Sequence, residues 1–335
     1  MSEQSRRSQW DRSLFRWRRK VWGGLQFWAD VYFFHDWRIQ WGVLSNSYRL
    51  LDGRNYLYQT GTYEQCLEKL QQIRAEQKLP PMKGKAVVLI HGILRTRFSM
   101  SRFRKPLEEA GYNVFIWSYP STRVTIQQAA DLLARALSSL EGMEQVNFIV
   151  HSMGGLVLRA CLAKHKKHPP LGRVVMLGVP NLGAHLADRL RGLWLFRLLF
   201  GPAGQQLVTD PDGLIAQLPP PPCEFAIIAG ARGKESGYNP LIPGDDDGTV
   251  AVASTRLPGA ADFMTVRTLH SFLAMSSEVV EASVRFIQTG SFRASGERQP
   301  IPSTSSTEQT ATFAQTQQGK QQASENSEAP SERSS

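Results

Sequence analysis

Short apolar runs alternate with helix-patterned stretches between residues 83 and 290, and this alternation restricts the fold more than any other feature of the chain. The apolar runs predicted as strands are residues 86–90, 114–118, 146–150, 174–179, 225–229 and 264–268. The helical patterns lie at residues 100–110, 126–140, 153–164 and 278–287. Strands that alternate with helices form mostly parallel sheets with helices on both faces. We therefore expect an α/β fold in which ligands bind at the carboxyl ends of the strands.

The composition excludes several classes of protein. Hydrophobic residues make up 41% of the 335 residues, which reaches the globular range once glycine is counted as apolar. No stretch of 18 apolar residues occurs, so we expect no conventional membrane span. Cys66, Cys161 and Cys223 show neither metal-ligand nor disulfide spacing. We therefore expect no metal site, and a cytoplasmic, reducing environment.

Residues 1–82 form a basic, tryptophan-rich N-terminal arm that is predicted to be helical. Six of the eight tryptophans lie at or before Trp41, and residues 1–20 carry seven Arg or Lys against two acidic residues. Apolar positions between Leu14 and Tyr32 recur at helical spacing, with charged residues largely on the other face. A second helical pattern covers residues 63–76.

Two interpretations of this arm are open. A basic amphipathic helix with tryptophans suits an anionic membrane surface, which residues 10–41 would contact peripherally. Alternatively, the arm docks on the domain that follows it, or on another subunit. We do not expect nucleic acid as a partner. At the other end, 21 of the 41 residues from Ser295 onward are Ser, Thr or Gln, so residues 291–335 are predicted to be disordered.

The most informative motif spans residues 148–155, where an apolar run is followed by Ser152 and two glycines. A sharp strand-to-helix turn of this kind presents a serine hydroxyl at the edge of a sheet, which makes Ser152 the candidate nucleophile. Gly154 lets the helix approach the strand, and the N–H of Met153 is the first candidate oxyanion donor. Val150 occupies a position where glycine is usual in such turns. The alternative is an ordinary serine that caps a helix.

A second strand, residues 87–90, ends in His91-Gly92. Gly92 permits the backbone to bend there, so the N–H of Ile93 is the second candidate oxyanion donor. We expect the ring of His91 to brace this loop. Its use as a catalytic base is the alternative.

The candidate acid lies within Asp245, Asp246 and Asp247. We select Asp247, because a turn glycine and a strand-like run follow it. Asp245 and Asp246 are the alternatives, and a calcium loop is a further one whose ligand pattern is not met. His270 follows the last strand and is the candidate base, because the chain order serine, acid, histidine is that of the α/β-hydrolases.

An apolar insertion at residues 186–200 predicts a lid over the nucleophile, at about residues 182–208, that offers an acyl-chain pocket. The alternative for this segment is core packing against the sheet.

These motifs together resemble the lipase and palmitoyl-thioesterase-like branch of the α/β-hydrolase superfamily. The resemblance covers residues 83–290 and rests on the motifs around His91, Ser152, Asp247 and His270. It implies a mostly parallel sheet with a helical lid, hydrolysis of an acyl or lipid ester through an acyl-serine intermediate, and no cofactor. Thioester cleavage or acyl transfer by the same residues is one alternative. An inactive hydrolase fold that serves as a membrane adaptor is another.

Overall fold

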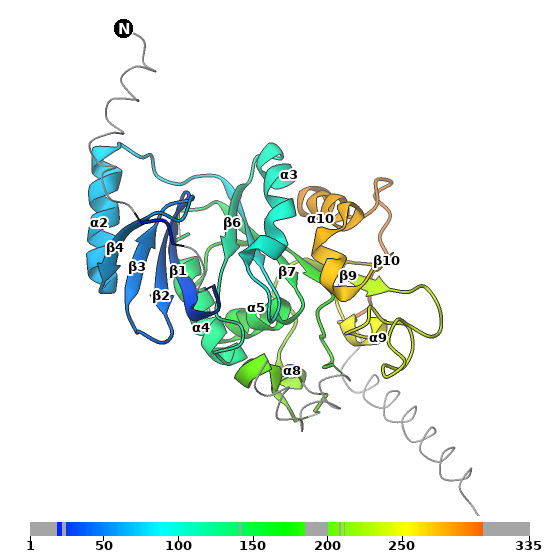
Figure 1. Cartoon of the computed structure of the whole chain (residues 1–335). Coiled ribbons are helices and arrows are strands. Elements are labelled where there is room, and N and C mark those ends of the chain that lie inside the picture. The colour runs from blue at the N-terminus through cyan, green and yellow to red at the C-terminus, as the bar shows by residue number, and fades with distance from the viewer. Residues whose placement is uncertain are drawn as a thin grey trace, which may run out of the picture.

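The structure is a computed structural model of the chain and describes residues 19–21, 25–140, 142–184, 200–207, 209–210 and 212–303. Two β-sheets form its framework (Figure 1). One has six strands in the order β10-β9-β8-β7-β5-β6, and every neighbouring pair in it is parallel. The other has four antiparallel strands in sequence order. The predicted parallel α/β architecture is therefore confirmed.

The parallel sheet follows the predicted alternation closely. Its strands are β5 (Lys85–Ile90), β6 (Asn113–Trp117), β7 (Gln145–His151), β8 (Leu171–Leu177), β9 (Phe225–Ala231) and β10 (Asp262–Arg267). The helices between and after them are η2 (Arg97–Phe103), α3 (Arg104–Glu109), α4 (Ile126–Ser138), α5 (Met153–Lys164), α8 (Leu214–Gln217), α9 (Val252–Thr255), η3 (His270–Met275) and α10 (Ser277–Thr289).

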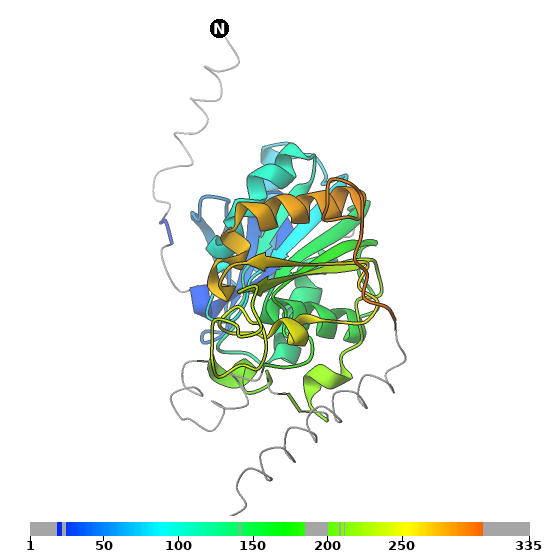
Figure 2. The same cartoon turned by 90° about the vertical axis from the view of Figure 1, so that its right-hand side faces the viewer.

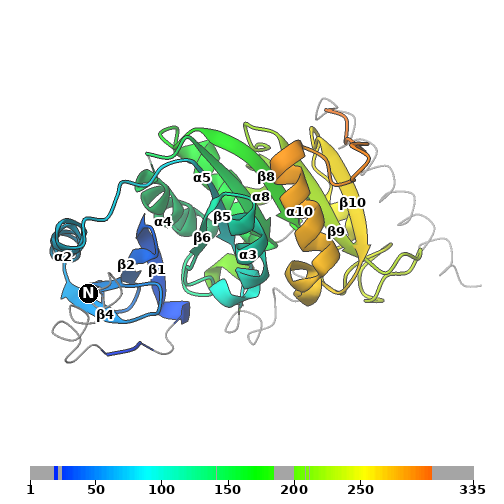
Figure 3. The same ribbon diagram turned by 90° about the horizontal axis from the view of Figure 1, so that it is seen from above.

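Each face of the parallel sheet has its own core. On β5, Ala86, Val88 and Ile90 point into a core that they share with α4 and α5. Val87 and Leu89 point to the opposite face, where α3 and α10 pack. Figures 2 and 3 show α10 lying along one side of this sheet. The central strands are therefore apolar on both faces, which is why they appear in the sequence as continuous apolar runs.

The N-terminal arm differs from its prediction. Its described part is a sheet of β1 (Trp28–Phe34), β2 (Trp37–Gly42), β3 (Tyr48–Leu51) and β4 (Leu57–Gly61), preceded by η1 (Leu25–Phe27). The predicted helix over 14–32 is wrong from Trp28 onward, because that run pairs with β2. The predicted helix at α2 (Tyr63–Glu76) is confirmed, and it covers the sheet with a small core of its own.

Asp30 joins this accessory sheet to the parallel sheet. Its backbone N–H donates to Ser118 O (2.8 Å), and its carboxylate accepts from Ser118 N (2.8 Å) and from Gln40 Nε2 (2.7 Å). Arg38 Nε lies 3.5 Å from the same carboxylate, and Trp117 Nε1 donates to Asp30 O (2.8 Å). Residues 25–61 therefore dock on the parallel sheet, beside β6. Contact of residues 10–41 with a membrane remains a prediction, and residues 10–18 and 22–24 of that stretch lie outside the described part.

The C-terminal boundary also differs from its prediction. Residues 291–303 pack on the domain, where Phe292 and Ile301 are buried. Ile301 exchanges backbone hydrogen bonds with Gly259 (3.0 Å) and Ala260 (2.9 Å), and Arg293 pairs with the buried Asp262 (2.9 Å). The predicted disorder is therefore wrong for this stretch, while residues 304–335 lie outside the described part. Most of the predicted lid, residues 185–199, also lies outside it. Among the described helices, none is both long enough and apolar enough to cross a membrane.

Asp30→Ala is expected to lower the free energy of unfolding by about 3–5 kcal/mol, because it leaves Arg38 buried without its ion-pair partner. Asp36→Ala is the matched control. Asp36 is exposed and lies 3.8 Å from Arg104, so its loss should cost less than about 1 kcal/mol. Urea unfolding measures both, and equal effects of the two substitutions would contradict the role given to Asp30.

Candidate active site

Ser152 lies at the turn between β7 and α5. Its backbone has φ +55° and ψ −131°, a left-handed conformation that few side chains adopt. Ser152 N donates to Leu177 O on β8 (2.9 Å), and Gly155 N donates to Ser152 O (3.0 Å). A Cβ on Gly154 would lie 2.7 Å from His91 O, so only glycine fits there. Val150 is buried in the core shared with α4 and α5, which accommodates the departure from glycine at that position.

The structure brings Ser152, His270 and Asp247 together from three separate loops. His270 Nε2 lies 2.9 Å from Ser152 Oγ, and His270 Nδ1 lies 2.6 Å from Asp247 Oδ2. His270 N also donates to Asp247 O (2.9 Å), which fixes the histidine backbone relative to the acid. The three side chains thus form one continuous hydrogen-bonded chain in which the carboxylate sets the imidazole tautomer with its proton on Nδ1.

The three neighbouring aspartates occupy different environments. Asp247 is buried, and its Oδ1 accepts from Thr249 N (3.0 Å) and Val250 N (2.8 Å) while Oδ2 faces His270. Asp245 accepts from Arg232 N (2.8 Å) and Gly233 N (3.0 Å).

Asp246, one of the alternatives for the acid, bonds to backbone N–H groups of its own loop. It is buried and accepts from Asn239 N (3.1 Å) and Gly248 N (2.6 Å), and burial raises its pKa. Asp246 therefore holds the shape of the loop. The described residues contain no group of side chains suited to a metal ion.

Three glycines make room for these side chains, and each follows or ends a parallel strand. A Cβ on Gly92 would lie 2.8 Å from Ser152 Cβ. A Cβ on Gly178 would lie 3.2 Å from the His270 ring, and one on Gly230 would lie 2.7 Å from Asp247 Cβ. The last two contacts were not predicted, because each joins residues far apart in the chain.

The two predicted oxyanion donors belong to residues that follow Ser152 and Gly92 in the chain. Met153 opens α5 directly after Ser152, and Ile93 follows Gly92, on which a Cβ would lie 2.8 Å from Ser152 Cβ. Among the described residues, neither N–H has a hydrogen-bond acceptor. Both N–H groups therefore remain candidates for binding an oxyanion.

The His91 ring contacts Tyr119 and the backbone of its own loop. Its Nδ1 lies 2.8 Å from Gly92 O, its ring stacks on Tyr119 at 4.6 Å, and Tyr119 Oη donates to His91 O (3.0 Å). Burial lowers the pKa of His91 to about 4. These contacts hold the loop that carries Ile93, in agreement with the bracing role expected for His91.

His151 contacts the candidate base, a role that was not predicted. The side chain is buried, its Nε2 donates to His270 O (3.1 Å), and the two rings lie 4.8 Å apart. Burial, and then the positive charge of His270, lower the pKa of His151 well below its ordinary value. His151 and His270 lie 119 positions apart in the chain, so local patterns do not predict their contact. Only the place of His151 next to Ser152 in the motif could have indicated a role at the site.

Comparison with known proteins adds three findings. Residues 56–214 match the model of a domain of unknown function, DUF7379, which includes Ser152 but ends before Asp247 and His270. No curated protein matches the sequence. Solved structures match at low identity.

The propeptide form of lipase BlEst2 from Bacillus licheniformis is 20% identical, with 66% of this chain and 52% of that chain covered and a TM-score of 0.50. The mature form of the same lipase is 23% identical, with 56% of this chain and 86% of that chain covered and a TM-score of 0.46. Phospholipase PlaB from Legionella pneumophila is 20% identical, with 51% and 44% covered and a TM-score of 0.43.

The parallel sheet, its order and the strand–serine–helix turn define the class of the fold. It is an α/β-hydrolase fold.

The free energy of unfolding is expected to fall as the pH drops from 8 to 5. His91 and His151 have lowered pKa values in the folded state, so the unfolded chain binds more protons below its ordinary histidine pKa of about 6.5. Each such histidine contributes up to about 2 kcal/mol to the free energy of unfolding. This contribution is present above about pH 6.5 and is lost as the pH falls toward 5. His151→Gln keeps a donor toward His270 O but cannot titrate. Chemical unfolding at pH 8 and at pH 5 measures the drop in the free energy of unfolding, which should be smaller by about 2 kcal/mol in the variant than in the parent. Equal drops in the two proteins would contradict a buried, neutral His151.

Proposed function

We propose that this chain is a serine hydrolase that cleaves carboxylic esters of acyl or lipid substrates through an acyl-enzyme on Ser152. The observation that carries the proposal is the unbroken series of hydrogen bonds from Ser152 Oγ through His270 to Asp247, at the carboxyl edge of a parallel sheet. The backbone N–H groups of Ile93 and Met153, which have no hydrogen-bond acceptor among the described residues, add to its support.

The geometry suits nucleophilic attack followed by proton return. Ser152 Oγ attacks the ester carbonyl while His270 Nε2 takes its proton, and the carbonyl oxygen becomes an oxyanion that accepts from Ile93 N–H and Met153 N–H. Asp247 stabilises the imidazolium and keeps its orientation. Collapse of this tetrahedral intermediate breaks the ester C–O bond, and His270 gives the proton to the leaving alcohol. Water then repeats these steps on the acyl-serine and releases the acid.

An acyl substrate is favoured by the apolar side chains around the site. Leu94 follows Ile93, while Leu269 and Phe272 flank His270, and all three are exposed. Leu182, which begins the predicted lid, is also exposed. Exposed apolar groups gathered on the loops of a site indicate an apolar ligand. The predicted lid at about residues 182–208, with its acyl-chain pocket, belongs to this proposal.

Ser152→Ala is expected to abolish labelling by a fluorophosphonate and to lower kcat by about 10⁶, by analogy with other serine hydrolases. Gel-based labelling and hydrolysis of a short soluble ester measure the two effects. The adaptor alternative predicts no labelling of the parent protein. Labelling that persists in Ser152→Ala would remove Ser152 from the role of nucleophile.

Substitutions of the neighbouring aspartates test the acid. Asp247→Asn should lower kcat/KM by about 10⁴, because an amide stabilises the wrong imidazole tautomer. Asp245→Asn is the matched control and should stay near parental activity. Asp246→Asn should lower the melting temperature, because the amide has one acceptor oxygen fewer for the backbone N–H groups of this buried loop. A severe loss of activity in Asp245→Asn alone would move the acid by two residues.

A panel of acyl esters and acyl thioesters of matched chain length discriminates between ester and thioester cleavage. Hydrolysis in the presence and absence of an alcohol acceptor discriminates hydrolysis from acyl transfer. The proposal expects esters to react faster than thioesters, with the free acid as product.

A further inference from the structure

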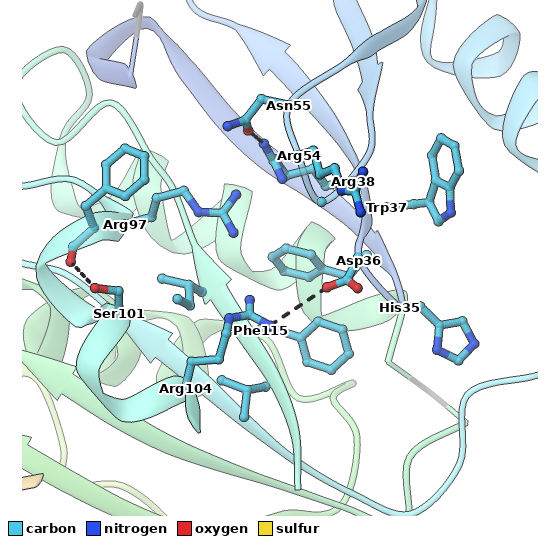
Figure 4. Close-up of a pocket in the computed structure, with 15 residues that line it drawn as sticks. His35, Asp36, Trp37, Arg38, Arg54, Asn55, Arg97, Ser101, Arg104 and Phe115 are labelled. Atoms are coloured by element: carbon cyan, nitrogen blue, oxygen red, sulfur yellow. Dashed lines mark hydrogen bonds and ion pairs between the residues drawn. The ribbon is translucent and has the colours of Figure 1, made fainter. Parts of the chain in front are cut away.

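A cavity of about 400 Å³ lies between the accessory sheet and the parallel sheet, apart from Ser152 (Figure 4). The turn after β1 and the start of β2 line one wall, and η2, α3 and β6 line the other. The apolar part of the lining comes from Phe33, Trp37, Phe98, Val114, Phe115 and Ile116.

The polar part of the lining is strongly cationic. Four arginines, Arg38, Arg54, Arg97 and Arg104, face a single acidic residue, Asp36. Figure 4 shows Arg38 and Arg97 entering from opposite walls with their guanidinium groups toward one another. Cations gathered in this way repel each other unless an anion lies between them.

Two of these arginines already have partners. Arg38 pairs with Asp30 (3.5 Å) and donates to Asp52 O (3.3 Å) and to the side chain of Asn55. Arg104 pairs with Glu108 (2.8 Å) and lies 3.8 Å from Asp36. The partners of Arg38 and Arg104 are thus supplied by the protein itself.

Arg97 is different, because its guanidinium has no hydrogen-bond or ion-pair partner among the described residues. It is only partly exposed to solvent. Burial lowers its pKa, and burial together with the charge of Arg97 lowers the pKa of Arg38 to about 10. A guanidinium carries five N–H donors in a planar fork, so an unpaired one facing a cavity is prepared to bind an oxyanion.

We infer that this cavity binds a phosphate group through Arg97, with Arg38 and Arg54 completing its cationic wall. A phosphate fits better than a carboxylate because it offers more oxygens to converging guanidinium groups and carries up to two negative charges. The phosphate is either that of a soluble phosphorylated molecule or that of a phospholipid headgroup. The proposal does not depend on hydrolysis at Ser152.

Calorimetric titration of the full chain with inorganic phosphate, at constant ionic strength, tests the proposal. We expect one saturable site, which Arg97→Gln weakens by about 10- to 100-fold because it removes a charge-assisted hydrogen-bonding group. The matched control is Lys105→Gln, which removes one positive charge from α3 outside the cavity and should change the affinity less than about twofold. Equal affinity in the parent and Arg97→Gln, or an equal loss in both variants, overturns the proposal.

The melting temperature in phosphate-free buffer separates binding from folding. Arg97 has no hydrogen-bond or ion-pair partner among the described residues, and the attraction of Asp30 and Asp36 is opposed by its burial and by the charge of Arg104, so Arg97→Gln should melt at the parental temperature or above it. Should it melt lower, Arg54→Gln becomes the deciding variant. Arg54 is exposed, so its substitution leaves packing intact and should weaken phosphate binding severalfold. No loss of binding in Arg54→Gln would then overturn the proposal.

Vesicles distinguish the two sources of the phosphate. Phosphatidylcholine vesicles with and without phosphatidic acid are sedimented with the parent protein and with Arg97→Gln. Binding that requires phosphatidic acid and Arg97, and that inorganic phosphate displaces, identifies a lipid headgroup. Phosphate binding that depends on Arg97 without vesicle binding identifies a soluble ligand. Vesicle binding that is independent of Arg97, with no titration signal, contradicts the site.

Discussion

The strained backbone of Ser152 is the constraint on which the candidate site depends. A non-glycine residue at φ +55° and ψ −131° costs about 1–3 kcal/mol, so the surrounding structure must hold it there. Two features do so: the hydrogen bond from Ser152 N to β8, and the approach of Gly154 to the carbonyl of His91. The turn is therefore fixed by three adjacent parallel strands, and its serine points to the edge at which those strands end.

Much of the site could be predicted because it follows from local patterns. Buried parallel strands are continuous apolar runs, and the candidate nucleophile, acid and base each come directly after one of them or within the next loop. The glycine and the strand-like run that follow Asp247 then select it as the acid, and chain order selects His270 as the base. What could not be predicted are contacts between residues far apart in sequence, such as Gly178 against the His270 ring and Gly230 against Asp247. The burial of Asp246 belongs to the same group, since its partners include Asn239 in a separate turn.

The accessory sheet was missed for a different physical reason. Nearly every residue from Leu25 to Phe34 is apolar, so a helical spacing can be selected from that run as easily as a strand. The signal that decides the matter is the two-residue turn at His35-Asp36 between two aromatic runs. The packed stretch 291–303 shows the same limit, because Phe292 and Ile301 find their buried places through tertiary contacts alone.

The docking of this sheet also explains why an unpaired charge exists beside it. Asp30 compensates Arg38 and ties β1 to β6, and in doing so it places Arg38 opposite Arg97 on the parallel-sheet side. Arg97 begins η2, and the segment from His91 to Arg97 runs directly from the loop of the candidate oxyanion donors to the cavity. Arg95 of this segment donates to Ser271, next to His270. The chain thus carries two local costs, a strained serine and an unpaired arginine, and the segment from His91 to Arg97 leads from the loop that approaches Ser152 to that arginine. Such costs persist where the rest of the fold offsets them and a function requires them, which is the physical reason to regard both ends as sites.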